Sequence, residues 1–414
     1  MYYLWRTKFQ HRSSEFKRNA SIRAGQEPLK DRQLLDVLIW MAGVSDITYL
    51  NTSSESELYK TLNKYDAIPS SLHGAARAAR TAKLATEAGQ SDPSKPLPKQ
   101  SLDESVPNPS WEILFLQSSA QKAVPVHFVA VDHTRRCLIM AIRGTFGLTD
   151  AVTMAGANLQ PVTLGRKSPN CAAHAGIVKS ANTLVELHVG TLCRYAWEGY
   201  QVRLVGHSYG GAVAAMIATY LHELEPSITA FCFACPPCVT AQLAEKTRHC
   251  TTTVVLDDDV IPRLTRHSIF ELHNELVETE RNLGNLISKD KDRFTTEPWD
   301  TTLYEWMRAK SDELEKGGLE RKSCTVDIPP EEELLYVPGT VIHLHRSTST
   351  QNLGVEAVQQ IPEEEHFGAA VADPQFFRKI ELSKTMVTDH LISNVRDAIR
   401  KYRDSLPLSA KPLK

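Results

Sequence analysis

One serine in this sequence lies in a setting that is typical of a catalytic nucleophile. Ser208 is the centre of Gly-His-Ser-Tyr-Gly, between an apolar run that ends at Gly206 and an alanine-rich run that follows Gly210. This G-x-S-x-G pattern predicts a sharp strand-to-helix turn that holds the serine hydroxyl above a sheet, next to a helix N-terminus. Side chains at the two glycines would collide with neighbouring backbone. A glycine-rich turn with an incidental serine is the alternative, and the flanking strand and helix patterns favour the nucleophile.

A serine hydroxyl becomes reactive when a histidine accepts its proton and an acid orients that histidine. In proteins with this turn, the acid follows the serine along the chain and the histidine comes last. The apolar run TTTVVL ends in three adjacent acids, Asp257, Asp258 and Asp259. A run of acids is by default a solvated turn, so residue types alone leave the choice among the three open.

Six histidines downstream of these acids are candidates for the base: His267, His273, His343, His345, His366 and His390. His343 and His345 fall inside a strand-like run, where a structural role is favoured. His390 lies near the start of the last predicted helix and beyond the last predicted strand. That is where a triad histidine is expected, so we expect His390 to be the base.

The elements that would position these residues alternate between strands and helices. Short apolar runs predict strands at 124–133, 136–145, 201–206, 228–237, 251–262 and 334–346. Helical spacing of apolar residues predicts helices at 176–196, 211–224 and 385–402. A polar turn separates the first two strands, which indicates a hairpin or neighbouring strands. The alternation predicts an α/β fold with a mainly parallel central sheet flanked by helices.

The composition along the chain divides it into three parts. Residues 1–88 are predicted to be a helical extension, and packing on a larger domain is favoured over lying on a membrane surface. Residues 89–110 are rich in proline and serine and are predicted to be a linker or loop. Residues 111–405 form the main predicted domain, with a polar insertion at about 268–330.

The bulk composition limits the classes of partner and compartment. The 414 residues have a net charge of −2, which argues against a nucleic-acid-binding protein. The N-terminus lacks the apolar core and cleavage site of a signal peptide, and the apolar run 34–44 is too short to cross a bilayer. We therefore expect a cytoplasmic protein, with peripheral contact to membranes as an open alternative. The oligomeric state is not determined by these patterns.

Three cysteines at C-x-x-C-x-x-C spacing, Cys232, Cys235 and Cys238, suggest a zinc or redox site when taken in isolation. Cys232 lies in a predicted core strand, and the sequence has no second C-x-x-C pair to complete a four-ligand site. Buried structural thiols are therefore favoured over a metal site.

Four motifs in the same order as in a known family extend these interpretations. They are Ile142-Arg143-Gly144-Thr145 with Asp150, Gly206-His-Ser-Tyr-Gly-Gly211, Asp259-Val-Ile-Pro-Arg263, and the set Ser383, Met386, Asp389 and His390. Together they resemble the class 3 lipase family, especially its sn-1-specific diacylglycerol lipase-like branch. The resemblance covers about residues 111–402. It departs from the family at Tyr209, where the family usually has leucine.

The resemblance implies an α/β-hydrolase fold and assigns roles to residues. Asp259 corresponds to the triad acid of the family, and His390 corresponds to its histidine. Thr145 corresponds to the oxyanion-hole residue that acts together with the backbone N–H of Tyr209. No cofactor or metal is implied. The segments 146–165 and 268–330 are candidates for gating the site, and ordinary surface loops are the alternative for both.

The expected function is a serine-dependent lipase or esterase that hydrolyses the acyl esters of acylglycerols through an acyl-enzyme. Its substrate partner would be a lipid or another acyl ester. A phospholipase A1, a galactolipase or a soluble carboxylesterase remains an alternative, because the same triad serves all of them. A catalytically silent scaffold that uses the hydrolase fold to bind partners is the alternative from another class.

Overall fold

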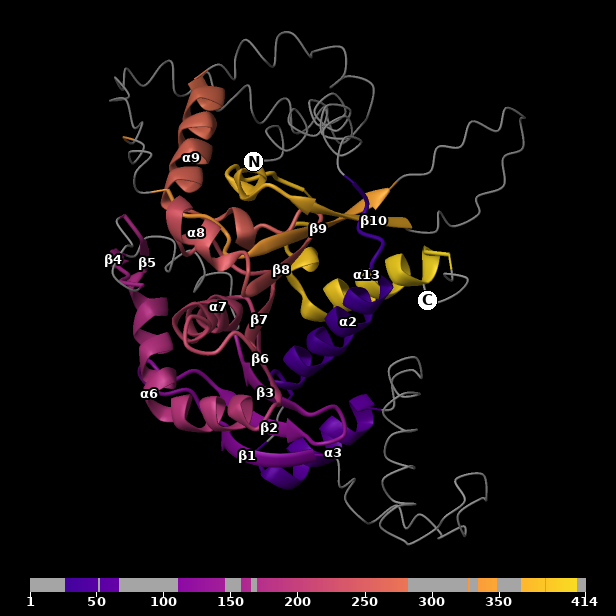
Figure 1. The fold of residues 1–414 in the computed structure, drawn as a ribbon. Coiled ribbons are helices and arrows are strands. Elements are labelled where there is room, and N and C mark those ends of the chain that lie inside the picture. Colours follow the sequence, from indigo (N-terminus) through magenta and orange to yellow (C-terminus); the bar gives the residue numbers. More distant parts are fainter. Residues whose placement is uncertain are drawn as a thin grey trace, which may run out of the picture.

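A computed structural model describes residues 27–50, 53–66, 111–145, 158–164, 170–281, 327, 334–347, 366–383 and 385–407. The predicted linker 89–110 lies outside the described residues, as do most of the segment 146–165 and most of the insertion 268–330. In the described part of the chain, an eight-stranded sheet forms the centre of the molecule, with helices on both faces (Figure 1).

The strands of this sheet are, in order across it, β1 (Trp111–Gln117), β2 (His127–Asp132), β3 (Cys137–Ile142), β6 (Gln201–His207), β7 (Ile228–Phe233), β8 (Thr251–Leu256), β9 (Thr340–Ser347) and β10 (His366–Ala372). The five central strands, β3 to β9, run parallel to one another. The edges are antiparallel, since β1 pairs with β2, β2 with β3, and β9 with β10. The predicted mainly parallel sheet and the predicted pairing of the first two strands are confirmed.

The central strands are continuous apolar runs because both of their faces are covered. Every residue of β2 and of β3 is buried, as expected for strands with helices on both sides. The sequence patterns did not predict the two edge strands. β1 is mostly half-buried, and β10 (HFGAAVA) is rich in glycine and alanine, which have weak strand propensity. Pairing with β2 and β9 makes them strands.

Each face of the sheet has its own helices. The helices are α2 (Arg32–Ile47), α3 (Glu55–Asp66), α6 (Ala175–Trp197), α7 (Tyr209–Leu221), α8 (Ala241–Thr247), α9 (Arg266–Arg281) and α13 (Ile392–Ser405). One apolar cluster joins α6 and α7 to one face of the sheet. A second cluster joins α2 and α13 to the other face, where the two helices lie side by side (Figure 1). A separate two-stranded sheet pairs β4 (Leu159–Pro161) with β5 (Ala172–His174).

The helix α2 belongs to the segment expected to be an N-terminal extension, and it packs directly on the sheet. Arg396 of α13 pairs with Asp46 of α2 at 3.1 Å, and Arg403 pairs with Asp36. The hydroxyl of Tyr402 donates a hydrogen bond of 2.7 Å to the carbonyl of Leu29. These contacts hold α2 and the residues before it against α13. The boundary between an extension and the main domain stays a prediction.

The last helix starts later than the sequence pattern indicates. It was predicted over 385–402, but α13 begins at Ile392, and a separate 3-10 turn, η4 (Thr388–His390), precedes it. Leu391 between them has extended backbone, with φ −69° and ψ 126°. His390 therefore lies on a turn before the helix and not in the helix itself.

A buried histidine pair makes the stability of this fold sensitive to acid. The Nε2 atoms of His127 and His188 lie 2.9 Å apart. The Nδ1–H of His127 donates to the Pro125 carbonyl, so Nε2 of a neutral His127 is an acceptor, and the Nε2–H of His188 donates to it. Burial lowers the pKa of both histidines. The neighbouring His127 lowers the pKa of His188 further, to about 4. Unfolded histidines titrate near pH 6.5, so the unfolded chain binds more protons between these values.

We therefore expect the free energy of unfolding to decrease as the pH falls from about 6.5 towards 4. Urea titrations at pH 7 and pH 5 would measure the decrease in the native protein and in a His127→Phe/His188→Leu variant. The free energy of unfolding should decrease less in the variant than in the native protein. After allowance for solvent screening, the difference should be on the order of 1 kcal/mol. An equal decrease in both proteins would contradict the assignment.

Candidate active site

The predicted turn around Ser208 joins β6 to α7. Ser208 has φ 54° and ψ −126°, a strained conformation for a residue with a side chain. A Cβ atom at Gly206 would collide with the backbone of Gly210, and one at Gly210 would collide with the carbonyl of Ile142 in β3. Both glycines are therefore required by close backbone contacts, as the motif predicted.

The hydroxyl of Ser208 is not used to stabilise the helix that it precedes. Ser208 is the N-cap residue of α7, yet its side chain makes no capping hydrogen bond. Serine is preferred at this position because its hydroxyl usually does make that bond. The backbone N–H of Ser208 instead donates to the carbonyl of Phe233 at 2.8 Å. The hydroxyl is thus held at the positive end of a helix without a structural task there.

Tyr209 follows the serine, and its side chain reaches towards α6. Its hydroxyl donates to the carbonyl of Gly176 at 3.2 Å and lies 2.8 Å from the hydroxyl of Ser180. Burial raises the pKa of Tyr209, so the phenol keeps its proton. The tyrosine therefore ties the start of α7 to the start of α6. This contact explains a residue for which the sequence offered no reason.

The parallel pairing of β3 and β6 brings Gly144, the residue before Thr145, close to Ser208. Ile142 at the end of β3 is paired with Gly206, so the residues after both strands leave the sheet side by side. A Cβ atom at Gly144 would lie 3.0 Å from the Cβ of Ser208. Thr145 comes next and is half-buried. Of the two oxyanion-hole candidates, Tyr209 thus follows the candidate nucleophile in the chain, and Thr145 follows a glycine that lies against it.

Asp259 and His390 form a hydrogen-bonded pair. The Nδ1 of His390 lies 3.1 Å from both carboxylate oxygens of Asp259, which is fully buried. The same carboxylate accepts the N–H of Ile261 at 2.9 Å. Because Nδ1–H donates to the acid, Nε2 of His390 is the nitrogen that can accept a proton. Of the three adjacent acids, Asp259 is the one that bonds to His390.

The histidine turn also approaches the serine turn. The Nε2 of His207 lies 2.6 Å from the carbonyl oxygen of His390, and the centres of the two rings are 4.6 Å apart. Within the described residues, no hydrogen bond joins the Ser208 hydroxyl to the His390 ring. In hydrolases without substrate, such bonds are often long and form only when substrate binds.

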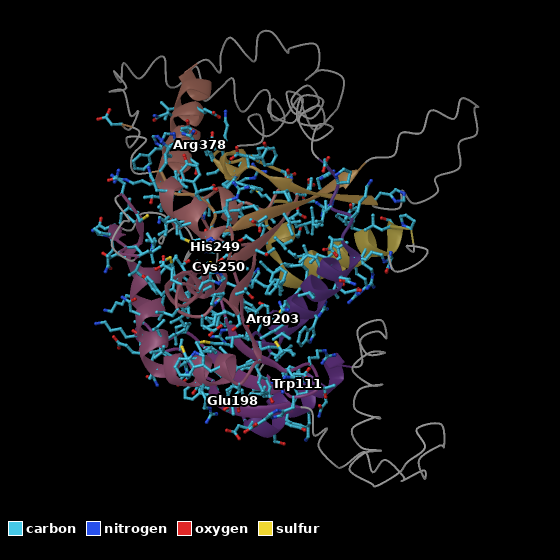
Figure 2. All side chains as sticks on the ribbon, in the orientation of Figure 1. Trp111, Glu198, Arg203, His249, Cys250 and Arg378 are labelled. Carbon is cyan, nitrogen blue, oxygen red and sulfur yellow. The ribbon has the colours of Figure 1, made fainter. Side chains whose placement is uncertain are left out.

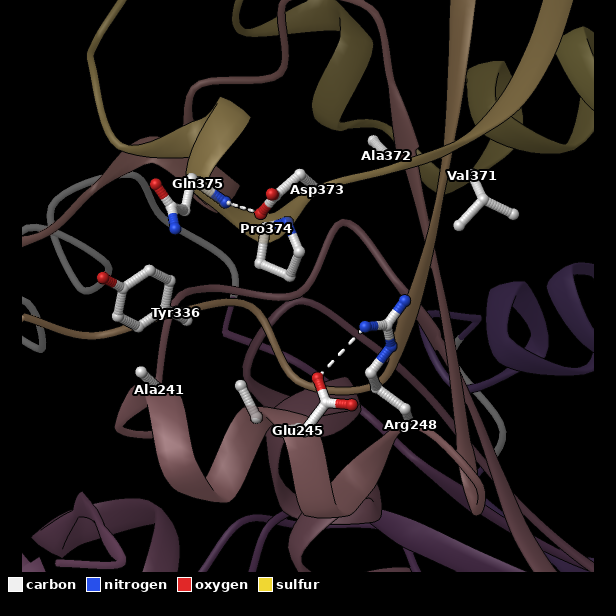
Figure 3. Close-up of a pocket in the computed structure, with 10 residues that line it drawn as sticks. Ala241, Glu245, Arg248, Tyr336, Val371, Ala372, Asp373, Pro374 and Gln375 are labelled. Atoms are coloured by element: carbon white, nitrogen blue, oxygen red, sulfur yellow. Dashed lines mark hydrogen bonds and ion pairs between the residues drawn. The ribbon is translucent and has the colours of Figure 1, made fainter. Parts of the chain in front are cut away.

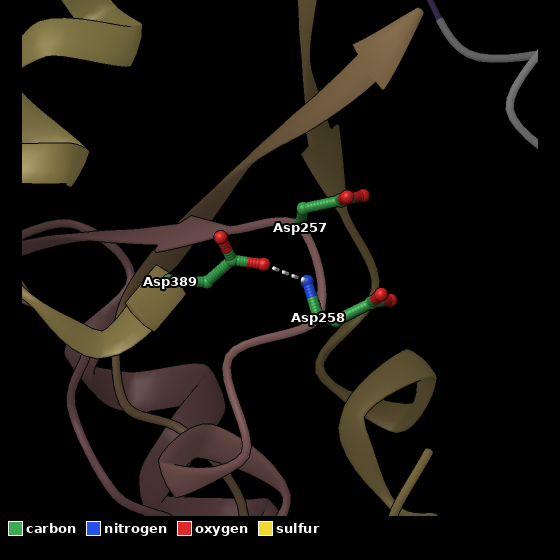
Figure 4. Close-up of side chains that lie close together, drawn as sticks. All are labelled: Asp257, Asp258 and Asp389. Atoms are coloured by element: carbon green, nitrogen blue, oxygen red, sulfur yellow. Dashed lines mark hydrogen bonds between the residues drawn. The ribbon is translucent and has the colours of Figure 1, made fainter. Parts of the chain in front are cut away.

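Three carboxylates gather behind the histidine turn, those of Asp257, Asp258 and Asp389 (Figure 4). The carboxylate of Asp389 accepts the N–H of Asp258 at 3.2 Å. Such a group has the residue types of a cation site. Arg346 at the end of β9 supplies a positive charge here, with its guanidinium 2.6 Å from Asp389 and 3.0 Å from Asp257. The geometry is that of an ion-pair network.

This network fixes the turn that carries His390. Burial opposes the charge of Arg346, but Asp389 and then Asp257 outweigh burial and raise its pKa. Asp389 directly precedes His390, so the ion pair anchors the turn to β9. The sequence motifs included Asp389 but not Arg346, which is 43 residues away from it. No local spacing connects the two.

Replacing Arg346 by methionine is expected to destabilise the protein by about 3 kcal/mol, because the buried Asp389 would lose its cation. Urea unfolding at pH 7 would measure the loss. The matched control is Arg400→Met, whose partner Asp397 is solvent-exposed, and this variant should lose about 1 kcal/mol or less. Equal losses in the two variants would show that the network contributes no more than a surface pair.

The C-x-x-C-x-x-C cysteines are all buried. The thiol of Cys232 donates to the carbonyl of Gly211 at 3.1 Å, and burial raises the pKa of Cys232. Cys250 lies next to His249 (Figure 2), and its thiol donates to the carbonyl of Thr247 at 3.5 Å. These contacts fit the interpretation as structural thiols.

One surface pocket of about 430 Å³ lies between α8, the segment around Tyr336 and the end of β10 (Figure 3). Its lining includes Glu245 and Arg248, which form an ion pair of 3.0 Å. None of the candidate catalytic residues lines it. It therefore has no part in the chemistry considered for Ser208.

The comparison with known proteins agrees with this geometry. A family model, lipase (class 3), matches residues 139–268, from β3 through the serine turn to Asp259. Over these residues the chain is similar to the class 3 lipases. His390, Asp389 and Arg346 lie outside the range that the model matches. The candidate triad is therefore completed from a more distant part of the chain.

The curated proteins to which this chain is similar include two diacylglycerol lipases. It is 27% identical to diacylglycerol lipase-beta of Mus musculus over 290 residues, which are 64% of this chain and 42% of that protein. It is 23% identical to diacylglycerol lipase-alpha of Rattus norvegicus over 296 residues, 67% of this chain and 27% of that protein. The chain thus spans less than half the length of the curated relatives it matches.

Among solved structures, this chain is similar to a lipase from Rhizopus microsporus var. chinensis, with 16% identity and a TM-score of 0.41 over 57% of this chain and 70% of that one. A Rhizomucor miehei triacylglyceride lipase gives 16% identity and a TM-score of 0.40 over 58% and 77%. The α/β-hydrolase fold follows from the sheet order and the serine turn. In the described part of the chain, no helix combines the length and apolarity needed to span a bilayer.

Proposed function

We propose that this protein hydrolyses the acyl esters of acylglycerols through a covalent acyl-enzyme. The observation that carries the proposal is the bond of Asp259 to His390 Nδ1 beside a strained serine turn whose hydroxyl does not cap its helix. Those are the elements of a serine hydrolase triad, in the chain order that α/β-hydrolases use.

In the proposed reaction, the Ser208 oxygen attacks the ester carbonyl while its proton passes to Nε2 of His390. The tetrahedral intermediate collapses, and His390 gives the proton to the departing alcohol. Water then attacks the acyl-enzyme with His390 as base, and the acid is released with Ser208 restored. Asp259 keeps Nδ1 protonated and stabilises the imidazolium that forms. This mechanism needs no cofactor or metal.

The negative charge of each tetrahedral intermediate would be stabilised by an oxyanion hole. Its donors are the backbone N–H of Tyr209, at the start of α7, and Thr145. The first N–H groups of a helix have no partner within the helix, and they lie at its positive end. A preorganised donor of this kind typically accelerates acyl transfer by a factor of about 10² to 10³.

An apolar rim beside His390 favours lipid esters over water-soluble ones. Val387 and Leu391 flank the histidine turn, and they are 49% and 50% exposed. Exposed apolar side chains around a catalytic histidine suit acyl chains or the surface of a lipid aggregate. Together with the diacylglycerol lipase relatives, this rim supports acylglycerols as the substrate class. A cytoplasmic enzyme that contacts membranes peripherally fits the same substrates.

The test is a substrate panel on the purified protein. We expect hydrolysis of diacylglycerol in mixed micelles, and a fluorophosphonate probe should label Ser208. Faster hydrolysis of phospholipids, galactolipids or short water-soluble esters would replace diacylglycerol with one of those classes. A well-folded protein that forms no acyl-enzyme with any activated ester would instead support a catalytically silent scaffold.

A further inference from the structure

A tyrosine just beyond α2 lies within the candidate active site, although it belongs to the segment expected to be an extension. Tyr49 follows the C-cap of α2, and its hydroxyl contacts two groups that are distant in the sequence. It lies 2.7 Å from Nδ1 of His207, and it accepts a hydrogen bond of 3.1 Å from the N–H of Gly144. The ring of Tyr49 packs edge-on against the ring of His207, with 5.4 Å between the two ring centres.

The hydrogen bonds through this tyrosine have one consistent direction. The carbonyl oxygen of His390 can only accept, so Nε2–H of His207 donates to it. A neutral His207 then has Nδ1 as an acceptor, and the Tyr49 hydroxyl donates to it. The phenol oxygen in turn accepts the N–H of Gly144. A continuous chain of bonds thus runs from Gly144 through Tyr49 and His207 to His390.

Both side chains in the middle of this chain keep the required protonation. His207 is almost completely buried, and its burial, followed by the proximity of His390, lowers its pKa to about 3. Burial also raises the pKa of Tyr49. The chain of bonds therefore has the same direction throughout the neutral range of pH.

We propose that Tyr49 is a positioning residue of the active site. It holds the backbone at Gly144, next to the oxyanion-hole candidate Thr145, and, through His207, the backbone of His390. This proposal rests on the proposed hydrolase function. Gly144 directly precedes Thr145, and His390 is the proposed base, so one hydroxyl links the two parts that must meet at the ester carbonyl. Tyr49 does not touch the reacting atoms and acts through its partners.

The packing of α2 gives Tyr49 the rigidity that this role needs. The N–H of Tyr49 donates to the carbonyl of Asp46 at 3.0 Å, and the side chain of Asp46 is paired with Arg396 of α13. The residue before it, Thr48, bonds through its hydroxyl to the carbonyl of Ser45 at 2.7 Å. The backbone at Tyr49 is therefore held by local hydrogen bonds, and the preceding turn is tied to α13.

The experiment compares Tyr49→Phe with the native protein in the ester assay. We expect kcat to fall about tenfold with KM within about twofold, because the loss affects alignment of the catalytic groups and not substrate binding. The matched control is Tyr402→Phe, which removes another buried hydroxyl that ties the α2 segment to the fold. It should lower the unfolding midpoint but leave kcat within about twofold.

The outcomes separate this proposal from the proposed function. If the native protein neither hydrolyses esters nor reacts with the fluorophosphonate at Ser208, the function itself fails. If the native protein is active and Tyr49→Phe retains its kcat, the positioning role is overturned. Equal kcat losses in Tyr49→Phe and Tyr402→Phe would also overturn it, because they would indicate a merely structural effect.

A second variant keeps the test decisive if Tyr49→Phe does not fold. His207→Leu removes both the acceptor for the Tyr49 hydroxyl and the donor to the His390 carbonyl. We expect it to lower kcat as well, and an unchanged kcat in this variant would contradict the proposal. Where Tyr49→Phe does fold, the loss in the double variant should be smaller than the product of the single losses, since both changes break the same link. Losses that multiply would contradict the proposal.

Discussion

Replacement of Ser208 by alanine should lower kcat for ester hydrolysis by up to about 10⁶-fold while the protein remains folded. The chemistry is lost because no other hydroxyl occupies the end of the strained turn. The fold is retained because the hydroxyl makes no capping bond and alanine is close to serine in size. Initial rates with an activated ester, together with thermal unfolding, would measure both parts of this expectation.

A matched control for this change is Ser45→Ala, at another fully buried serine, in α2 on the opposite face of the sheet. Its hydroxyl oxygen is buried without a hydrogen-bond partner, so its removal should leave both activity and stability unchanged. Hydrolysis that survives in Ser208→Ala would identify a different nucleophile. Fluorophosphonate labelling of that variant, followed by peptide mapping, would locate it.

Replacement of Asp259 by asparagine should lower kcat by about 10⁴-fold, as loss of the acid does in other serine triads. The amide of asparagine can donate to Nδ1 of His390, and this favours the tautomer whose Nε2 carries a proton. Such a histidine cannot accept the proton of Ser208. The rate should be measured with a saturating ester at pH 8 in both proteins.

The adjacent acids provide the control for this position. Asp257→Asn removes one partner of Arg346 but leaves the bonds between Arg346 and Asp389. It should therefore lower kcat by less than about tenfold, because the turn that carries His390 stays anchored to Arg346. A larger loss in Asp257→Asn than in Asp259→Asn would reverse the assignment of the triad acid.

The parts of this fold that were predictable are those that local patterns encode. Buried parallel strands are continuous apolar runs, and the amphipathic spacing of α6 and the alanine-rich α7 is equally local. The edge strands β1 and β10 were not predictable in this way, because pairing with a neighbour makes them strands. The start of α13 was also missed, since the η4 turn that bears His390 depends on contacts with Asp259 and the neighbouring acids.

The same division holds for the candidate site. Motif order along the chain was sufficient to name Ser208, Asp259, His390 and Thr145, because each lies in a short segment with its own signature. No segment around Tyr49 or Arg346 has such a signature. Tyr49 is 95 residues from Gly144, and Arg346 is 43 residues from Asp389.

The physical reason is the range of the interactions involved. The strained serine turn needs glycines at two fixed positions, and this requirement is written in five consecutive residues. Hydrogen bonds and ion pairs between distant segments require only that the folded chain brings a donor near an acceptor. The sequence alone therefore predicted the chemistry at Ser208. Only the tertiary structure decided that the segment after α2 supplies Tyr49, that β9 supplies Arg346, and that the hydroxyl of Tyr209 is turned towards α6.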